Sequence, residues 1–246
     1  MRIAVVSDIH GNALALDALL ADLSGERIEH GVCLGDAIQG GAQPAAVVAR
    51  LRELAWPVVM GNADAWLLTG VETGAQGPPS AYQLAVRDWS LAQLSVDDRA
   101  FIAAFRPTVE FDLPGGTPLL CAHGSPKSFD DIILPEMGDA GVLDLLGPTG
   151  GAIVCGGHTH TQQFRPLGDR FWFNPGSVGL PFRRDLSDDP SRVGRWAECA
   201  VLTVEEDGRT RLEFRRIPYD VERLIESIRA SGIPEPERLA ERYRVD

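Results

Sequence analysis

Apolar residues in the first quarter of the chain follow two different spacings, which together predict a strand–helix–strand–helix–strand order. Residues 2–7 form a short, β-branched apolar run that is typical of a strand. The leucines of residues 13–23 recur at helical spacing, and residues 44–54 are expected to form a second helix. Short apolar runs at 31–35 and 56–61 predict the second and third strands. This order favours a parallel α/β arrangement with right-handed crossovers.

The rest of the chain changes character and predicts many short strands. A Gly/Pro-rich loop between Gly70 and Ser80 precedes helical stretches at roughly 80–94 and 97–105. Short apolar or alternating runs predict strands at residues 108–113, 117–122, 152–155, 162–166, 170–174, 197–205 and 210–217. Turn residues that suit hairpins separate several of these strands, at 114–116, 168–169 and 207–208.

The last part of the chain predicts two amphipathic helices, at residues 221–230 and 235–244. The pattern as a whole predicts a mixed pair of β-sheets flanked by helices. We expect a single domain over residues 1–246, in which the helices of residues 219–246 act as closing elements.

Composition and charge narrow the classes of partner. The chain is 44% hydrophobic, so it can bury a sizeable core, and its formal net charge of -12 disfavours binding to long nucleic acids. Small phosphorylated molecules are still possible substrates, because bound cations can reverse the sign of the charge inside a cleft. No apolar run is long enough to cross a membrane. The four cysteines form no CxxC pair, and we expect reduced thiols in a cytoplasmic protein.

Acidic and amide residues follow each of the first three predicted strands. Asp8 and His10 end the first strand, Asp36 follows the second, and Asn62 and Asp64 follow the third. Taken alone, each of these residues could simply cap a helix or a turn. Since the carboxyl ends of parallel strands meet at one edge of a sheet, we expect these side chains to lie together. In extended chain, positions i and i+2 point the same way, so Asp8 and His10 could face one centre.

Four of the five histidines share this setting at the end of a strand and beside a glycine. His123 follows the strand of residues 117–122, and His158 and His160 follow the strand of residues 152–155; only His30 lacks such a position. Imidazole, carboxylate and amide groups together suit Mn²⁺, Fe, Zn²⁺ or Ni²⁺ better than Ca²⁺ or Mg²⁺. The ligands exceed the needs of one ion, so we expect two ions, roughly 3.5–4 Å apart and bridged by a carboxylate. We favour manganese.

The order of these motifs resembles that of the calcineurin-like metallophosphoesterase superfamily, in particular its small bacterial and archaeal phosphodiesterase-like members. The matching motifs are Asp8-Ile9-His10, Gly35-Asp36, Gly61-Asn62-Ala63-Asp64, His123-Gly124, Gly157-His158-Thr159-His160 and Asn174-Pro175-Gly176-Ser177-Val178-Gly179. The resemblance implies a four-layer αββα sandwich, in which a metal-bound hydroxide rather than a protein side chain attacks phosphorus. It also implies one metal at Asp8, His10 and His160, a second at Asn62, His123 and His158, and Asp36 as the bridge between them.

One position departs from the family pattern. Many members carry a histidine where this chain has Ala63, and that histidine is thought to protonate the leaving group or hold phosphate. Alanine can do neither, so we expect the enzyme to depend on acidic leaving groups or on a proton from solvent. Because small phosphodiesterase-like members share the departure, we favour diesters over monoesters.

Several residues outside the metal motifs are candidates for supporting roles. Asp64 is a candidate for orienting a metal ligand without itself binding the ion. Asn62, Asn174, Ser177 and Arg183 are candidates for binding substrate. For Asn174 and Ser177 the alternatives are steadying the metal histidines or forming a plain Pro-Gly turn. For Arg183 the alternative is a solvated loop, because acidic residues follow it closely.

Two function classes compete on this basis. The first is a phosphoester hydrolase that acts on a small, nucleotide-derived or other phosphorylated substrate. The second is a catalytically silent, metal-binding scaffold for protein–protein interaction, since the superfamily includes a retromer subunit that serves mainly as a protein-binding surface. The complete set of seven metal-ready side chains favours the hydrolase.

Overall fold

The computed structural model describes residues 1–71, 78–149, 151–182 and 193–244. Its strands form two sheets, of which the first has four strands in the order β2-β1-β8-β9. β1 pairs with β2 in parallel and with β8 in antiparallel, and β8 and β9 form a long antiparallel hairpin. These strands are β1 (Arg2–Val6), β2 (His30–Cys33), β8 (Trp196–Val204) and β9 (Thr210–Pro218).

The second sheet has five strands in the order β3-β4-β5-β7-β6. β4, β5 and β7 run parallel to one another, whereas β3 and β6 are joined to their neighbours as antiparallel hairpins. A short 3-10 turn, η1 (Pro114–Gly116), connects β3 to β4. The strands are β3 (Val109–Asp112), β4 (Pro118–Cys121), β5 (Ile153–Cys155), β6 (Gln162–Leu167) and β7 (Arg170–Pro175).

The two sheets pack face to face, and alternation along β1 shows why. Ile3 and Val5 point into a fully buried apolar core between the sheets, where they meet residues such as Leu119 and Phe173 of the second sheet. The intervening residues of β1 point to the opposite face, which is covered by α1 (Ala13–Leu23) and α2 (Pro44–Leu54). Period-2 burial on both faces is what a sheet inside a layered sandwich requires.

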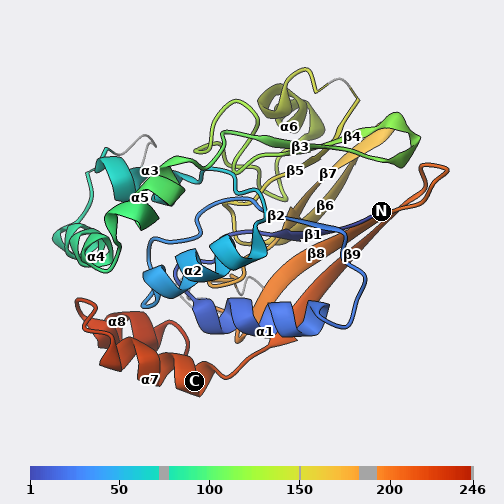
Figure 1. Ribbon diagram of the computed structural model, residues 1–246. Helices are drawn as coiled ribbons and strands as arrows, with labels where there is room; N and C mark the ends of the chain where they lie inside the picture. Colours follow the sequence, from blue (N-terminus) through green and yellow to red (C-terminus); the bar gives the residue numbers. More distant parts are fainter. Residues whose placement is uncertain (72–77, 150, 183–192, 245–246) are drawn as a thin grey trace.

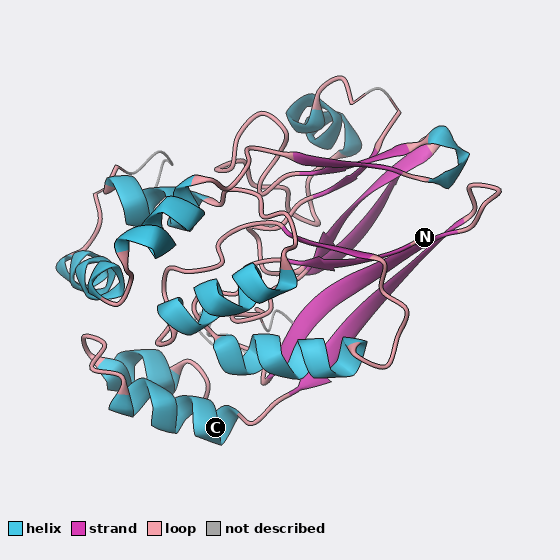
Figure 2. Cartoon of the chain, in the orientation of Figure 1, coloured by secondary structure: helices cyan, strands magenta, loops and turns pink. Residues whose placement is uncertain are grey.

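A helix also covers the outer face of the second sheet. Val142 and Leu146 of α6 (Asp139–Leu146) pack against Val154 and Trp172 of that sheet. Figure 1 shows the resulting succession of helix, sheet, sheet and helix, and Figure 2 shows the two sheets side by side between the helices. The structure therefore confirms the predicted αββα sandwich with two mixed sheets.

The remaining helices gather at one end of the sandwich (Figure 1). They form two groups. The first comes from the middle of the chain and comprises α3 (Asn62–Thr69), α4 (Ala81–Ala92) and α5 (Val96–Ala103). The second comes from the end of the chain and comprises α7 (Val221–Ala230) and α8 (Pro236–Glu241). Capping boxes at Ser80 and Ser95 begin α4 and α5. A separate apolar cluster joins α7 and α8 to Val86 of α4 and to Leu180. This cluster matters below, because Leu180 adjoins the candidate site.

Two sequence predictions need correction. The third strand predicted at residues 56–61 is reduced to isolated parallel bridges at Val58 and Val59. Pro57 lacks an N–H group, so it cannot extend the ladder of hydrogen bonds. The helices α3 and α6 were not predicted at all; α3 begins at Asn62 within a segment that we interpreted only as a ligand motif.

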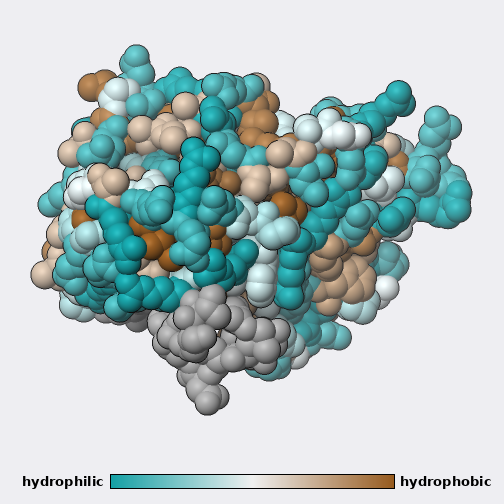
Figure 3. Space-filling view, turned by 90° about the horizontal axis from the view of Figure 1, so that it is seen from below, coloured by the Kyte–Doolittle hydropathy of each residue, from teal (hydrophilic) through white to brown (hydrophobic). Residues whose placement is uncertain are grey.

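The face of the molecule in Figure 3 is largely hydrophilic, with apolar residues in small separate groups. Within the described ranges, none of the helices combines the length and the apolar character that crossing a bilayer requires.

Candidate metal centre

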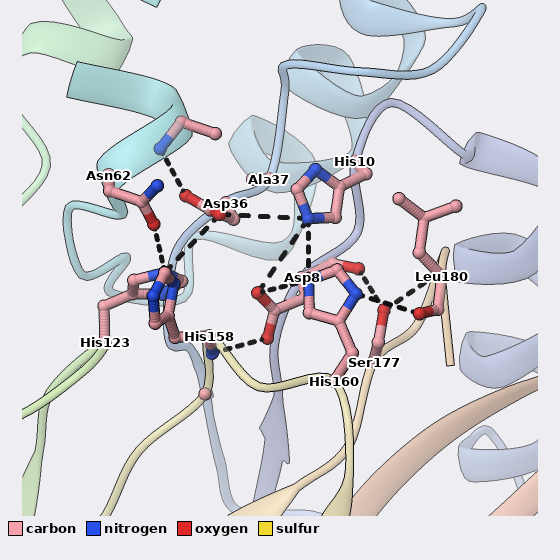
Figure 4. A network of polar contacts seen from close by, with 12 residues as sticks. Asp8, His10, Asp36, Ala37, Asn62, His123, His158, His160, Ser177 and Leu180 are labelled. Atoms are coloured by element: carbon pink, nitrogen blue, oxygen red, sulfur yellow. Dashed lines mark hydrogen bonds and ion pairs between the residues drawn. The ribbon is translucent and has the colours of Figure 1, made fainter. Parts of the chain in front are cut away.

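The seven predicted ligands converge at one edge of the two sheets (Figure 4). Asp8 and His10 follow β1, and Asp36 follows β2, so they come from the first sheet. The remaining ligands come from the second sheet and from a helix: His123 follows β4, His158 and His160 follow β5, and Asn62 begins α3. The loops at the carboxyl ends of strands in both sheets thus meet at a single place.

Three of these residues form a first group. Asp8, His10 and His160 offer ligand atoms that all lie within 4.8 Å of one another. The Nε2 atoms of His10 and His160 are 3.0 Å apart. Asp8 Oδ1 lies 3.2 Å from His160 Nε2 and 3.9 Å from His10 Nε2. One cation could contact all three atoms.

A second group lies beside the first. Asp36, His123 and His158 also offer ligand atoms within 4.8 Å of one another. His123 Nε2 is 3.5 Å from Asp36 Oδ2 and 3.0 Å from Asn62 Oδ1. Asp36 Oδ2 is also 3.8 Å from His10 Nε2, which belongs to the first group. The carboxylate of Asp36 therefore stands between the two groups, where a bridging ligand would have to be.

Hydrogen bonds to backbone carbonyls fix the orientation of three histidine rings. The Nδ1 atoms of His10, His123 and His160 lie 2.7, 2.8 and 2.9 Å from the carbonyl oxygens of Gln39, Leu34 and Leu180, respectively. Because a carbonyl only accepts, each Nδ1 must carry the proton and donate it. The Nε2 atoms then face the centre, as they do in metal sites whose ligands are held from behind.

The first group is unsatisfied without a cation. With both Nδ1 atoms donating, the two Nε2 atoms of His10 and His160 face each other across 3.0 Å, where two unprotonated nitrogens would direct their lone pairs at each other. Asp8 Oδ1 is fully buried and makes no hydrogen bond. Buried acceptors without donors are rare and call for an explanation. A divalent cation among these three atoms would satisfy all of them, so the donor set fits a metal ion.

The electrostatics of the second group favour positive charge. Burial opposes charging of His123, but the adjacent Asp36 carboxylate outweighs it and raises the pKa of His123 to about 9. Burial alone would raise the pKa of Asp36, yet His123 holds that pKa below its usual range. In the first group, burial and then the nearby His160 lower the pKa of His10 to about 4. His10 is therefore neutral and ready to bind at physiological pH.

The backbone at the centre adopts an unusual conformation. Among the described residues, seven that are not glycine have positive φ, and five of these are predicted ligands: Asp8, His10, Asp36, His158 and His160. The expectation that Asp8 and His10 converge through extended chain is therefore wrong. Left-handed turns aim these side chains, and such turns are costly for residues with a Cβ atom and tend to cluster at functional sites.

Comparison with known proteins places this arrangement in a family. Residues 1–206 match the family model described as the calcineurin-like phosphoesterase superfamily domain. The chain belongs to the calcineurin-like phosphoesterase superfamily. This membership covers most of the chain and includes every predicted metal ligand.

Individual relatives are distant in sequence, and the solved structures among them are similar in fold. An uncharacterized protein of Methanocaldococcus jannaschii is 24% identical over 238 residues, which cover 95% of this chain and 94% of the relative. A hypothetical protein of Pyrococcus horikoshii has a TM-score of 0.81 at 20% identity, with 99% and 98% of the two chains covered. A metallophosphoesterase of Sphaerobacter thermophilus has a TM-score of 0.73 at 23% identity, with 98% and 97% covered.

Asp64 supports the predicted metal ligands from behind. Its carboxylate is fully buried and accepts hydrogen bonds from the backbone N–H groups of Ala37 (3.1 Å) and Ile38 (3.0 Å). These two residues follow Asp36 directly, so Asp64 connects helix α3, which carries Asn62, to the loop of Asp36. Burial, followed by the nearby Asp36 charge, raises the pKa of Asp64 to about 7. Its place fits the predicted orienting role.

The residues predicted to bind substrate differ in their surroundings. Asn174 is fully buried, and its Nδ2 donates to Gly157 O (2.6 Å) and Thr159 Oγ1 (3.1 Å) in the loop of the last two histidines. Ser177 is also fully buried and bonded to the backbone. Direct substrate contact is thus disfavoured for both residues, and the alternative of steadying the histidines is favoured. Arg183 lies outside the described residues, and partly exposed Asn62 stays a candidate for contacting substrate.

Sequence reasoning missed several parts of the centre. Phe182 stacks on the His160 ring with centroids 4.8 Å apart and an interplanar angle of 26°. Gly157 leaves no room for a side chain, because a Cβ atom there would lie 2.0 Å from Ser7 Oγ and 2.8 Å from Asp8 Oδ2. The glycines beside each histidine were the available signal for such close packing. The backbone carbonyls that hold the histidine rings could not be found from the sequence, because every residue has a carbonyl group.

Proposed function

We propose that this protein hydrolyses phosphoester bonds at a dinuclear metal centre and prefers small, nucleotide-derived diesters. The observation that carries the proposal is the position of Asp36, whose Oδ2 lies 3.5 Å from His123 Nε2 and 3.8 Å from His10 Nε2. A carboxylate shared by two groups of ligands is the feature that separates a two-metal hydrolase from a protein with a single structural ion.

The side chains of the centre have distinct tasks in this proposal. Asp8, His10 and His160 would hold one ion, and Asn62, His123 and His158 the other, with Asp36 between them. A bound pair of divalent cations lowers the pKa of a shared water and stabilises charge on the phosphoryl oxygens. Asn62, which is partly exposed, would orient a substrate oxygen from the rim of the centre. Manganese is the proposed metal, because it accepts mixed nitrogen and oxygen ligands.

The preference for diesters rests on Ala63. Its backbone N–H donates to Asp36 Oδ1 (2.8 Å), and its methyl group can neither protonate a leaving group nor bind phosphate. The leaving group must then depart as its anion or take a proton from solvent. Rates should therefore fall steeply as the pKa of the leaving group rises, which is the Brønsted behaviour of a reaction without a positioned acid.

The test is a panel of substrates assayed with the Mn²⁺-loaded protein. Bis-p-nitrophenyl phosphate should turn over faster than p-nitrophenyl phosphate, and aryl diesters faster than alkyl diesters. Equal rates for aryl and alkyl esters would refute the argument from Ala63. A protein that holds two metal ions yet hydrolyses nothing on the panel would favour the silent scaffold.

The proposed location is the cytoplasm. All four cysteines are buried and free, including Cys121 and Cys155, which face each other on the adjacent strands β4 and β5. Free thiols are typical of a reducing compartment. Fractionation of the source cells would test the location directly.

A further inference from the structure

Ser177 sits at a junction between two segments of the first metal group. It is fully buried, and its hydroxyl donates to the carbonyl oxygen of Asp8 at 2.7 Å. The Ser177 hydroxyl oxygen in turn accepts a hydrogen bond from the N–H of Leu180 at 2.8 Å. The carbonyl of Leu180 accepts the Nδ1 proton of His160 at 2.9 Å. Figure 4 shows this chain of contacts running from Asp8 to His160.

These bonds connect two ligands of one group that come from different sheets. The segment of residues 177–180 also pairs with the end of β1, because the N–H groups of Val178 and Gly179 donate to the carbonyls of Ser7 and Asp8. The segment thereby fixes the backbone of Asp8 and, through Leu180, the ring of His160. The spacing between Asp8 Oδ1 and His160 Nε2 depends on it.

The second group has separate supports. The His123 ring is held by Leu34, and Asp36 is held by the N–H of Ala63 and through the loop that Asp64 binds. Ser177 contacts none of these residues through its hydroxyl. His123 and Asp36 are thus supported by other parts of the chain than Ser177, whereas the His158 N–H joins the two groups by donating to Asp8 Oδ2 at 3.1 Å.

We propose that Ser177 is a positioning residue that sets the geometry, and hence the metal affinity, of the Asp8/His10/His160 group alone. The proposal rests on the dinuclear centre proposed above. It assigns to the Asn-Pro-Gly-Ser segment a task that is separate from substrate binding. It also makes the affinities of the two metal sites separately adjustable.

The C-terminal helices reinforce the segment of residues 177–180. The Tyr243 hydroxyl donates to the carbonyl of Gly179 at 2.9 Å, and the side chain of Leu180 packs in the apolar cluster of α7 and α8. The Asn12 amide, which caps α1, donates to the Tyr219 hydroxyl at 3.2 Å and so joins the same elements. Tyr219 and Tyr243 follow the region that the family model matches. This end of the chain therefore supports one half of the centre.

The test compares Ser177→Ala with the matched control Ser90→Ala. Ser90 is also fully buried, and its hydroxyl donates to a backbone carbonyl at 2.8 Å, but it lies within helix α4. Metal-free proteins are titrated with Mn²⁺ by calorimetry. Ser177→Ala should weaken one of two binding steps by roughly 10- to 100-fold, the usual effect of removing a partner that holds a metal ligand. Ser90→Ala should leave both steps unchanged.

A second variant protein identifies which metal-binding step Ser177→Ala affects. In a His160→Ala protein the first group is already broken, so adding Ser177→Ala should not weaken the remaining step. Tyr243→Phe provides a gentler variant should Ser177→Ala fail to fold; it should weaken the same step by a few-fold. Unchanged affinity in these variants, or equal weakening of both steps, would overturn the role of Ser177. A wild-type protein that binds no Mn²⁺ would instead refute the dinuclear centre itself.

Discussion

Replacing Asp36 by asparagine separates the proposed bridging role of this residue from its structural role. Asp36 Oδ1 accepts a hydrogen bond from Ala63 N–H at 2.8 Å, whereas Oδ2 faces His10 and His123. Asparagine keeps an oxygen for Ala63 and places an NH₂ group, which cannot bind a cation, towards the centre. It also tolerates the φ of 48° at this position, where alanine would be strained. The variant should therefore fold.

The expected loss can be bounded from simple electrostatics. Two unit charges 4 Å apart interact by about 4 kcal/mol at an effective dielectric constant of about 20. A bridging carboxylate lies closer than this to two divalent ions, so about 4 kcal/mol per ion is a lower bound. At about 1.4 kcal/mol per factor of ten, each ion should bind at least ~10³-fold more weakly. Hydrolysis at metal concentrations that saturate the wild type should become undetectable.

The assay pairs metal analysis with turnover of bis-p-nitrophenyl phosphate. Asp220→Asn makes the same change of charge at the N-cap of α7, which binds Arg223 N–H and lies outside the centre, and it should behave as wild type. Circular dichroism should show that metal-free Asp36→Asn is folded but melts lower than the metal-free wild type, because the buried contact between the Asp36 carboxylate and His123 has been lost. An Asp36→Asn protein that retained two ions and a near-normal rate would refute the bridging assignment.

Three further outcomes follow from the structure. Ala63→His should raise kcat/KM for an alkyl diester by roughly 10²-fold and leave a p-nitrophenyl ester nearly unchanged, because only the poor leaving group needs an acid; equal gains on both would count against this. Chelation should lower Tm by roughly 5–10 °C, since a ligand at 100 times its Kd stabilises the fold by about 2.7 kcal/mol, and Mn²⁺ should restore it. Burial raises the pKa of Tyr219 to about 12. The neutral phenol therefore contributes stability below its usual pKa of about 10, and up to about 3 kcal/mol is lost as pH rises towards 12. Tyr219→Phe should show a shallower loss in denaturant titrations over that range, and an unchanged slope would contradict the assignment.

Much of the fold was predictable because local and global preferences agree. The predicted helices at 13–23 and 44–54 have the same bounds in the structure. In the first, leucine spacing coincides with the Asn12 side chain as N-cap, and in the second, Pro44 occupies the first turn. The β8–β9 hairpin was likewise marked by its Asp-Gly turn. Where the apolar pattern, the capping residue and the turn residues all favour the same element, tertiary packing stabilises that element and does not change it.

The residues that make up the site were predictable from the sequence, but their geometry was not. Motif order alone selected the residues that the structure brings into two groups. The division of His158 and His160 between these groups came from family resemblance, and no local spacing implies it. Left-handed backbone at Asp8 and His10 replaces the extended geometry that residue spacing suggested. Such conformations depend on the fold around the loop, so a local pattern cannot reveal them.

The energetic costs concentrated at the centre argue for an ion-binding role over a metal-free docking surface. Asp8 and Asp36 are buried carboxylates, the Nε2 atoms of His10 and His160 lie 3.0 Å apart, and five ligands have positive φ. Left-handed residues alone cost about 1–3 kcal/mol each, and an unpaired buried acceptor costs a similar amount. Asparagine or glycine at these positions would relieve most of that cost and would leave the outer surface of the molecule unchanged. A protein that served only as a docking surface would therefore gain stability by losing these side chains. Bound cations would offset these costs, so metal binding is the physical reason that we propose for the site.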